Sequence, residues 1–337
     1  MAQRILAVDR QLESVDRQYL FVSYRRFFRK QVEPVAGLAI QYRCNLFRHF
    51  FFLLKLLAGA PTIYLHSVIN ILPILPLFPL LNRATFVILD AHGVVPEEQQ
   101  LAGRRFKSSL YALSERMAFR RANTVLVVTR NMETHFRGKY PQSMPTYVQY
   151  AILPAHLDPD RQPRLAMEGT PQDGLLRVVY SGNLQSWQNI DEMVQLIRAN
   201  QDDRILYDIL TGEPTAMKAQ LRAMGVTSPN VRVQTVAPNE LAKFYQAAHY
   251  GIILRDDIPV NRVACPTKLV EYLYYGMIPI VKSVHIGDFE ALGYEYLASE
   301  AFSAAVEARK SLVNQAVARA LIEQHRCTDI KSILTGR

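Results

Sequence analysis

Short runs of β-branched and aromatic residues alternate along the chain with segments whose apolar residues recur at helical spacing. In the second half, these runs predict strands at 175–182, 205–212, 231–237, 250–256 and 278–283. The helical pattern predicts helices between them at 189–200, 213–224, 239–249 and 267–276. Such alternation is typical of βαβ units, whose right-handed crossovers build a parallel sheet covered by helices.

The first half shows the same rhythm less regularly. We expect strands at 19–24, 62–67, 85–93, 124–129 and 147–151, and helices at 41–57, 99–121 and 131–138. The chain after Ser299 is expected to be helical throughout. Residues 56–82 carry no full charge, but prolines interrupt them, so we expect a buried strand and a Pro-broken apolar helix rather than a membrane span.

The predicted fold class is α/β, with two doubly wound domains. Residues 152–174 hold four prolines and indicate a connection between the two halves. We therefore expect a first domain over 1–152, a linker over 153–174 and a second domain over 175–320. The last segment, 321–337, is expected to be a helix that packs back on the first domain.

Composition excludes several classes of protein. Apolar residues make up 49% and charged residues 20% of the chain, which excludes global disorder. The three cysteines, Cys44, Cys265 and Cys327, lie far apart and form no CxxC pair. This pattern excludes a disulfide framework and a structural zinc knuckle, and it is typical of a reducing cytosol.

Positive charge is concentrated in the first half. Residues 1–165 contain 22 Lys and Arg against 11 Asp and Glu, whereas residues 166–337 contain 17 against 19. Such asymmetry indicates contact with an anionic surface, either nucleic acid or lipid headgroups. No nucleic-acid recognition motif is present, and RRFFRK (25–30) mixes cations with aromatic residues as interfacial membrane segments do. The alternative is a solvated face that covers a buried helix.

The segment 255–281 carries the strongest chemical signal. Pro266 is suited to the first turn of a helix and Gly276 to its end. Thr267 and Lys268 would then lie at a helix N-terminus, where free N–H groups bind phosphate. Glu271, one turn further, could accept hydrogen bonds from sugar hydroxyls. The alternative is a capped helix in which Lys268 and Glu271 pair with each other.

Several other chemistries lack their motifs. The chain contains no G-x-x-x-x-G-K-[ST], no G-x-G-x-x-G after a strand, no H-E-x-x-H and no G-x-S-x-G. No acidic pair is placed by its spacing for glycoside hydrolysis.

Five segments resemble one enzyme family. PTKLVEYLYYGMIPIV (266–281) resembles the nucleotide-binding segment of the family-four retaining glycosyltransferases of the GT-B fold, above all those that build bacterial surface polysaccharides. YSGNLQSWQNIDEM (180–193) resembles the segment that opens their donor domain. ILTG (209–212), followed by VQTVAPNELAKFYQAAHYGIILR (233–255), keeps the family's order of elements, and VILDAHGVVPEE (87–98) in the first half also resembles the family.

The resemblance implies two Rossmann-like domains facing a central cleft and a nucleotide-sugar donor held by the second domain. It implies no metal and no cofactor other than this donor substrate. The residues that it assigns to donor binding are Gly182, Asn183, Gly212, Val236, Arg255, Thr267, Lys268 and Glu271.

His92 and Lys268 are the catalytic residues that the resemblance implies. His92 follows Asp90 at the end of a predicted strand and would touch the transferred sugar or the acceptor. The alternative is a strand-end histidine bonded to backbone, and His66 has a weaker claim to the same role. Lys268 would stabilise the departing diphosphate, with Arg255 or Arg262 in support.

The chain departs from the family pattern at two places. The family's two glutamates, eight residues apart, would fall on Val263 and Glu271, and only the second is present. Asn183, Gln185 and Gln188 stand where basic residues are usual. These departures indicate either a subfamily with its own donor contacts or an inactive relative.

Together these features predict a metal-independent hexosyltransferase that moves a sugar, with retention, to a glycan or polyprenyl-linked acceptor in surface polysaccharide synthesis. We expect it in the cytoplasm, peripheral at the inner face of the membrane and without a nucleic-acid partner. The alternatives are a nucleotide-sugar 2-epimerase and a non-catalytic partner that keeps the fold.

Overall fold

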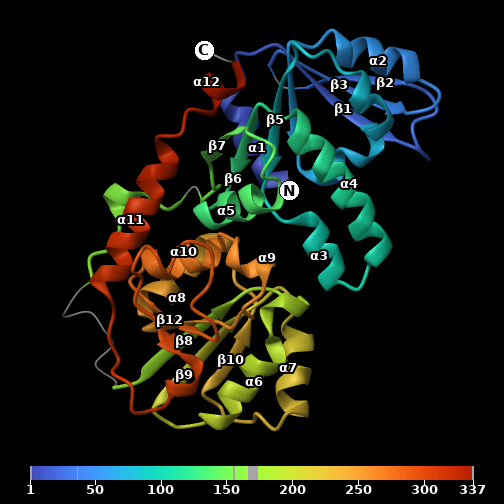
Figure 1. Cartoon of the computed structure of the whole chain (residues 1–337). Coiled ribbons are helices and arrows are strands. Elements are labelled where there is room, and N and C mark those ends of the chain that lie inside the picture. The colour runs from blue at the N-terminus through green and yellow to red at the C-terminus, as the bar shows by residue number, and fades with distance from the viewer. Residues whose placement is uncertain (1, 36, 155, 166–173, 336–337) are drawn as a thin grey trace. The chain divides into compact units, whose positions relative to one another are not determined.

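The computed structural model describes residues 2–35, 37–154, 156–165 and 174–335. The chain divides into two compact units (Figure 1). Unit 1 comprises Met1–Ile152 and Cys327–Arg337, and unit 2 comprises Leu153–Arg326. Residues 166–173 of the predicted linker lie outside the described residues, so the linker over 153–174 stays a prediction.

Unit 1 contains the following helices, strands and 3-10 turns: α1 (Ala2–Gln11), β1 (Arg17–Ser23), β2 (Gln31–Val35), β3 (Ala39–Asn45), α2 (Phe50–Ala58), β4 (Thr62–His66), η1 (Val68–Asn70), η2 (Leu72–Leu80), β5 (Phe86–Ala91), α3 (Val95–Leu101), α4 (Arg105–Arg121), β6 (Thr124–Val127), α5 (Arg130–Lys139), β7 (Thr146–Gln149) and α12 (Ile330–Thr335).

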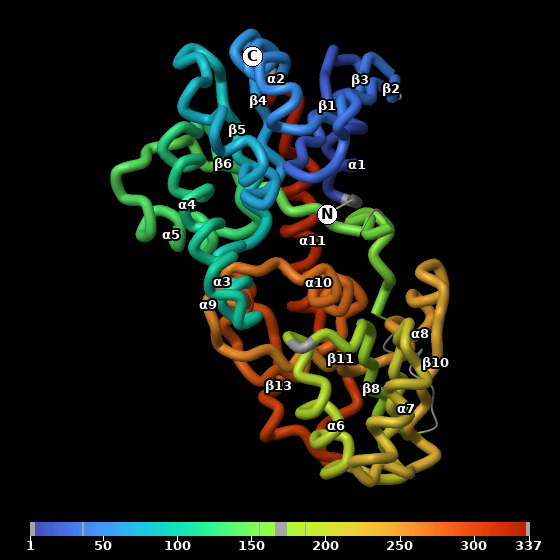
Figure 2. Tube along the Cα trace, turned by 90° about the vertical axis from the view of Figure 1, so that its right-hand side faces the viewer, coloured from blue at the N-terminus to red at the C-terminus, as the bar shows by residue number. Residues whose placement is uncertain are grey.

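A four-stranded parallel sheet with the order β4-β5-β6-β7 forms the centre of unit 1. Helices α4 and α5 lie on one side of it and α1 on the other (Figure 2). Side chains alternate along a strand, so Ile88 and Asp90 of β5 share one face. Ile88 packs there with Val8 of α1 and with Ile330 and Leu334 of α12. The α1 face of the sheet is therefore apolar at its centre and carries a buried acid at its carboxyl edge.

A second, three-stranded sheet with the order β1-β3-β2 precedes the main one. The helix predicted over 41–57 is wrong in its first part, because Ala39–Asn45 forms β3, paired in parallel with β1 and antiparallel with β2. Tyr42 and Ile40 in this run fit a pleated surface as well as a helix, and strand pairing decides between the two. Helix α2 begins only at Phe50.

The helix predicted over 99–121 is two helices, α3 and α4. Gly103 lies between them with a φ of +72°, a left-handed conformation that glycine adopts without strain. The apolar segment predicted as a Pro-broken helix forms the 3-10 helix η2, with Pro76 and Pro79 inside it. Among the described residues, no helix combines the length and the apolar character that crossing a bilayer requires.

Unit 2 contains the following elements: η3 (Pro159–Arg161), β8 (Leu176–Ser181), η4 (Ser186–Gln188), α6 (Ile190–Ala199), β9 (Ile205–Leu210), α7 (Pro214–Ala223), β10 (Val231–Gln234), η5 (Pro238–Glu240), α8 (Leu241–Ala247), β11 (Tyr250–Ile253), α9 (Pro259–Arg262), α10 (Thr267–Tyr274), β12 (Ile278–Val281), β13 (Leu297–Ala298), η6 (Ser299–Ala301) and α11 (Leu312–Arg326).

The six strands of unit 2 form one parallel sheet with the order β10-β9-β8-β11-β12-β13. The order reverses between β8 and β11, which is the topological switch point of a doubly wound sheet, where ligands bind. The strands and helices predicted for this half are present, with ends that differ by a few residues.

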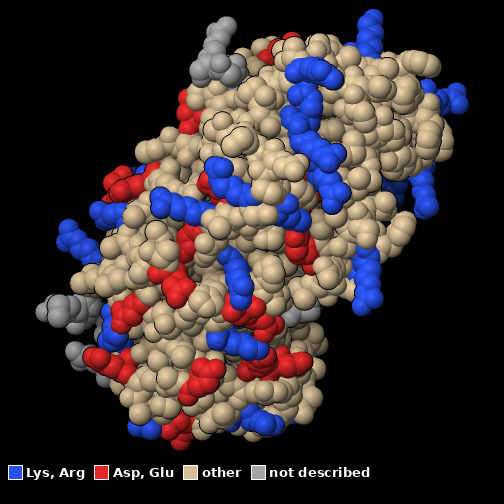
Figure 3. Space-filling model, viewed as in Figure 1, with Lys and Arg blue, Asp and Glu red and all other residues tan. Residues whose placement is uncertain are grey.

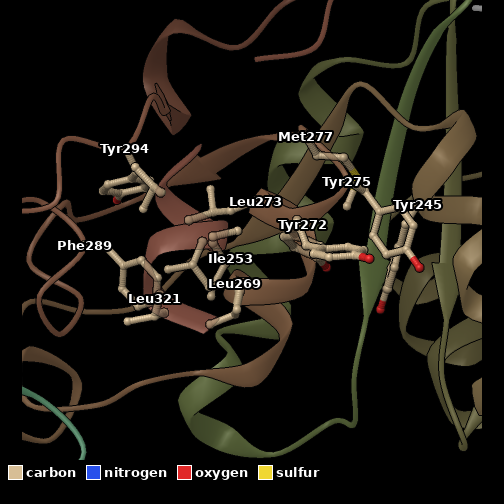
Figure 4. Packing of buried hydrophobic residues seen from close by; sticks show 14 of the residues in the cluster. Tyr245, Ile253, Leu269, Tyr272, Leu273, Tyr275, Met277, Phe289, Tyr294 and Leu321 are labelled. Carbon is tan, nitrogen blue, oxygen red and sulfur yellow. The ribbon is translucent and has the colours of Figure 1, made fainter. Parts of the chain in front are cut away.

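Helix α10 packs at the centre of the larger core of unit 2. Figure 4 shows Leu269 and Leu273 beside Ile253 of β11, with Phe289 on one side and Tyr272 on the other. All five side chains are almost fully buried. This packing fixes α10, and with it the residues at its N-terminus.

The chain after Ser299 is not helical throughout. Residues 302–311 form no helix, and only η6, α11 and α12 are helical there. Ser311 N donates to Gly276 O, and Asn314 Nδ2 donates to Met277 O and Glu295 O. These bonds tie the irregular segment and the start of α11 to the end of α10.

We predict that Gly251→Ala destabilises unit 2 by about 1–3 kcal/mol, the usual cost of overpacking a core. A Cβ at Gly251 in β11 would lie 2.4 Å from the Tyr272 ring, which is fully buried and has no room to move. Urea unfolding measures the change.

The matched control is Gly138→Ala in α5, where a Cβ meets nothing within 4 Å. We expect this variant to be neutral or more stable by about 1 kcal/mol, because alanine favours a helix. Equal midpoints for wild type and Gly251→Ala would contradict the packing of Tyr272 on β11.

Candidate functional site

The predicted donor-binding residues lie on the loops at the carboxyl edge of the unit 2 sheet. Gly182 and Asn183 follow β8, Gly212 follows β9, Val236 follows β10 and Arg255 follows β11. Thr267, Lys268 and Glu271 lie on α10. The folding of parallel strands therefore brings the ends of four segments to the edge where ligands of doubly wound sheets bind.

Lys268 lies in a polar and aromatic enclosure. Its Nζ donates to Gln188 Oε1 at 2.7 Å and lies 4.4 Å from the centroid of the Tyr180 ring. A Cβ at Gly182 would come within 3.5 Å of Nζ and within 2.9 Å of the Tyr180 hydroxyl. Glycine at 182 thus leaves space beside the ammonium.

Arg255 is the second cation of this enclosure. Its Nη1 donates to Asn261 Oδ1 at 3.3 Å, and its buried Nε has no hydrogen-bond partner among the described residues. Burial lowers the pKa of Arg255. Burial, with the charge of Arg255, lowers the pKa of Lys268 to about 7. Two cations lie close together here, and no ion pair with a carboxylate is found for either in the described chain.

The N-terminus of α10 adds oriented N–H groups next to Lys268. Leu269 N makes the first intrahelical bond, to Pro266 O, so the N–H groups of Thr267 and Lys268 precede it. Such groups carry partial positive charge and bind anions. Cations and helix terminus together favour a ligand that carries more than one negative charge.

Glu271 does not pair with Lys268. The Glu271 carboxyl lies near the imidazole of His156, whose Nε2 is 3.4 Å from Glu271 Oε1. Burial raises the pKa of the Glu271 carboxyl to about 7 and lowers the pKa of His156. The alternative of an internal Lys268–Glu271 pair is therefore wrong, and both side chains keep polar atoms for a ligand.

Gly212 and Val236 lie on neighbouring loops. Thr211 N donates to Gln234 O, and Thr235 Oγ1 donates to Thr211 O at 2.8 Å, which holds the β9 and β10 loops together. A Cβ at Gly212 meets nothing within 4 Å. These loops leave open space at the sheet edge.

Two further residues of the family pattern, Val263 and Arg262, have other surroundings in unit 2. Val263, where the family has its first glutamate, is buried, with 3% of its surface exposed. Arg262 pairs with Asp257 through Nε–Oδ1 at 2.5 Å and Nη2–Oδ2 at 2.9 Å. Its charge is committed to that carboxylate, so the expectation that Arg262 supports the diphosphate is not favoured, whereas Arg255 keeps its charge available.

His92 belongs to unit 1 and lies beyond the end of β5. Its Nδ1 is buried and lies 3.7 Å from Asp90 Oδ1, while His66 Nδ1 lies 3.3 Å from Asp90 Oδ2. The two imidazole rings are 4.8 Å apart. His66 and Asp90 are register partners in β4 and β5, so strand pairing alone brings these residues together.

These three side chains place possible metal-ligand atoms within 4.8 Å of one another. However, Arg4 Nε donates to both Asp90 oxygens at 2.8 Å, and the Tyr64 hydroxyl donates to Oδ2 at 2.6 Å. A guanidinium on the carboxylate opposes a divalent cation at the same place. The donor set therefore fits an ion pair flanked by imidazoles better than a metal centre.

Comparisons with known proteins identify the fold. No family model and no curated protein matches the chain. Among solved structures, sucrose-phosphate synthase from Thermosynechococcus elongatus is 15% identical with a TM-score of 0.59, over 98% of this chain and 88% of the other. HepE from Anabaena in complex with UDP and glucose is 12% identical with a TM-score of 0.59, over 99% and 95%. The lipopolysaccharide outer core galactosyltransferase WaaB is 11% identical with a TM-score of 0.55, over 87% and 82%.

These neighbours are GT-B glycosyltransferases, and the chain has the GT-B fold. The α/β fold class with parallel sheets that the sequence predicts is confirmed.

Sequence analysis did not find the environment of two site residues. Tyr180 lies within YSGNLQSWQNIDEM (180–193), but its position in the sequence does not indicate contact with the Lys268 ammonium. Arg4 lies 86 residues before Asp90, and no local pattern links an N-terminal helix to a strand end. A charged residue on the apolar stripe of α1 was the one available signal.

We predict that binding of UDP weakens as the pH rises above about 7. Free Lys268 loses its proton near that pH and must regain it to bind an anion, so affinity falls by up to about tenfold per pH unit. Calorimetry between about pH 7.5 and about pH 9.5 measures the slope. The Glu271→Gln background removes the titration of the carboxyl, whose pKa is also about 7.

In that background, the added change Lys268→Met should weaken binding and flatten the slope. A slope that persists without Lys268 would show that another group takes up the proton.

Proposed function

We propose that this protein is a metal-independent, retaining hexosyltransferase that uses a nucleotide-sugar donor. The observation that carries the proposal is the pair of enclosed cations, Lys268 and Arg255, beside the N-terminus of α10. An anion with two phosphates satisfies both charges at once. Sugar transfer from such a donor expels a nucleoside diphosphate, so the same charges stabilise the leaving group.

The other residues of unit 2 fit the rest of a donor. Glu271, as a carboxylate, accepts hydrogen bonds from a ribose diol, and the open space at Gly212, next to the loop of Val236, accommodates a base. His92 contacts the transferred sugar or the acceptor. In a retaining transfer the leaving phosphate itself takes the proton of the acceptor hydroxyl, so no separate strong base is required.

The acceptor that we propose is a glycan or a polyprenyl-linked glycan in bacterial surface polysaccharide synthesis. The resemblance of the sequence motifs supports this role. The structural likeness to WaaB, which is a lipopolysaccharide outer core galactosyltransferase, agrees with it.

A transfer assay tests the function. With a panel of nucleotide sugars and polyprenyl-linked acceptors, we expect transfer with retained anomeric configuration in the presence of EDTA. His92→Ala should lower kcat by at least about tenfold and leave donor affinity almost unchanged, because contacts made in the transition state affect turnover. His285→Ala, a half-exposed histidine of unit 2 paired with Glu290, is the matched control.

Three outcomes would contradict the proposal. A donor epimerised at C2 without acceptor would indicate an epimerase, and nucleotide-sugar binding without turnover would indicate a binding partner. Wild-type turnover in His92→Ala would return His92 to a structural role.

The small sheet of unit 1 presents a basic–aromatic surface, which we propose to contact the inner face of the cytoplasmic membrane. Three exposed phenylalanines, Phe28, Phe47 and Phe51, have 59%, 71% and 83% of their surface exposed. They alternate with the exposed cations Arg25, Arg26, Arg29, Lys30 and Arg48. Figure 3 shows Lys and Arg protruding along the margin of unit 1 that carries this sheet.

Three contacts hold this surface together. Asn45 Nδ2 donates to Tyr24 O and Arg26 O, and Lys30 Nζ lies 4.2 Å from the centroid of the Phe52 ring. From Arg17 to Ala58 the sequence contains one acid, Glu33. Each cation near an anionic headgroup contributes about 1 kcal/mol, and the aromatic rings fit the apolar boundary below it.

We predict that the protein sediments with phosphatidylglycerol vesicles at low salt and is released at high salt. Reversal to Glu at Arg25, Arg26, Arg29 and Lys30 should abolish sedimentation and leave UDP binding intact. The control reverses four exposed cations of unit 2, namely Arg198, Lys218, Arg222 and Lys243. Equal loss in both variants would indicate a net-charge effect, and binding that resists salt would indicate apolar insertion; either result would contradict the electrostatic proposal.

A further inference from the structure

A buried ion pair on the α1 face of unit 1 lies next to His92 and has no part in donor binding. Asp90 has no exposed surface, and Arg4 has 7% of its surface exposed. Arg4 Nε bonds both carboxylate oxygens at 2.8 Å, and the Tyr64 hydroxyl bonds Oδ2 at 2.6 Å. The carboxylate is therefore fixed in position and rotation by donors from α1 and β4.

Arg4 is itself held at several points. Its Nη1 donates to Tyr150 O at 3.1 Å, and its guanidinium lies 5.2 Å from the centroid of the Tyr150 ring. Val8, one turn further along α1, packs with Ile88, and Gln11 Nε2 donates to the Tyr150 hydroxyl at 3.2 Å. Helix α1 thus presents a fixed guanidinium to the end of β5.

The two imidazoles are arranged around this carboxylate. His66 is nine-tenths buried, whereas 21% of the His92 side chain is exposed. Nδ1 of His92 is buried 3.7 Å from Asp90 Oδ1 and makes no hydrogen bond among the described residues, so the carboxylate acts on it through its charge. Nε2 is the nitrogen that can reach a ligand. The charged and titratable groups that face the pair are Asp90, Arg4, Tyr64 and Tyr150, with Glu98 of α3 near His92.

We propose that Arg4 is a positioning residue for His92: it fixes the Asp90 carboxylate, which holds the imidazole with Nδ1 inward and Nε2 toward the bound sugar or acceptor. The proposal rests on the contact of His92 with the reacting molecules that is proposed above.

The physical reason is electrostatic. A fixed carboxylate attracts the N–H end of an imidazole, so it selects the tautomer with the proton on Nδ1 and leaves a lone pair on Nε2. Burial would raise the pKa of Asp90, but contacts from His66 and His92 and the charge of Arg4 hold it well below its usual range. Without the guanidinium, the carboxylate becomes a buried charge that turns or takes up a proton, and the tautomer is no longer selected.

The test compares Arg4→Met with wild type by two readouts. In imidazole ¹⁵N spectra, assigned with His92→Gln and His66→Gln, wild-type His92 should show the proton on Nδ1, and Arg4→Met should show a mixture of tautomers. In the transfer assay, kcat should fall by about ten- to a hundredfold with donor KM unchanged, the size usual when a partner that orients a histidine is removed. Arg10→Met, an exposed arginine of the same helix, is the matched control.

Arg4→Lys keeps the positive charge but cannot donate from one nitrogen to both Asp90 oxygens in the same geometry. The change in the His92 tautomer and the fall in kcat should therefore be smaller in Arg4→Lys than in Arg4→Met. If Arg4→Met does not fold, Arg4→Lys is the deciding variant. Unchanged ¹⁵N spectra in the deciding variant, with or without a lower melting temperature, would overturn the proposal and leave Arg4 a purely structural role. If wild type shows no transfer, the proposed function fails, while the spectra still decide whether Arg4 sets the state of His92.

Discussion

The functional site of unit 2 depends on two enclosed cations, Lys268 and Arg255, and no carboxylate of the described residues forms an ion pair with either of them. Enclosing Lys268 and Arg255 costs free energy, as the lowered pKa of each shows. The packing of α10 against β11 supplies the stability that holds them there. A bound anion attracts both cations and so offsets the free energy of enclosing them, which increases the affinity for the anion. Cation–π contact with Tyr180 and the bond to Gln188 maintain the ammonium until that ligand arrives.

The buried charge of unit 1, the Asp90 carboxylate, does have a partner of opposite charge. Asp90 is neutralised by the Arg4 guanidinium and accepts a hydrogen bond from the Tyr64 hydroxyl, so this carboxylate keeps no charge for a ligand to balance. An internally complete ion pair orients its neighbours rather than binding a substrate. Buried charges without a partner, as in unit 2, can attract a ligand of opposite charge. A buried charge with a partner, as in unit 1, can instead hold neighbouring side chains in position.

The sequence predicted unit 2 well because its strands are short, apolar and separated by helices of clear period. The sequence predicted unit 1 less well where the helix or strand preference of a segment is overridden by its pairing with neighbouring strands. Residues 39–45 could form a helix or a strand, and only β1 and β2 decide the matter. The site residues on loops followed from strand ends and motif resemblance. Their partners, Tyr180 for Lys268 and Arg4 for Asp90, are set by tertiary packing, which spacing along the chain does not record.

The packing of α12 on α1 has a consequence for how the protein is made. Val8 shares a core with Ile330 and Leu334, so the face of unit 1 that carries Arg4 is completed by residues more than three hundred positions later. During synthesis, unit 2 can form its sheet before that face closes. Unit 1 can therefore complete this face only after α12 has been synthesised, whereas the described elements of unit 2 precede α12 in the chain.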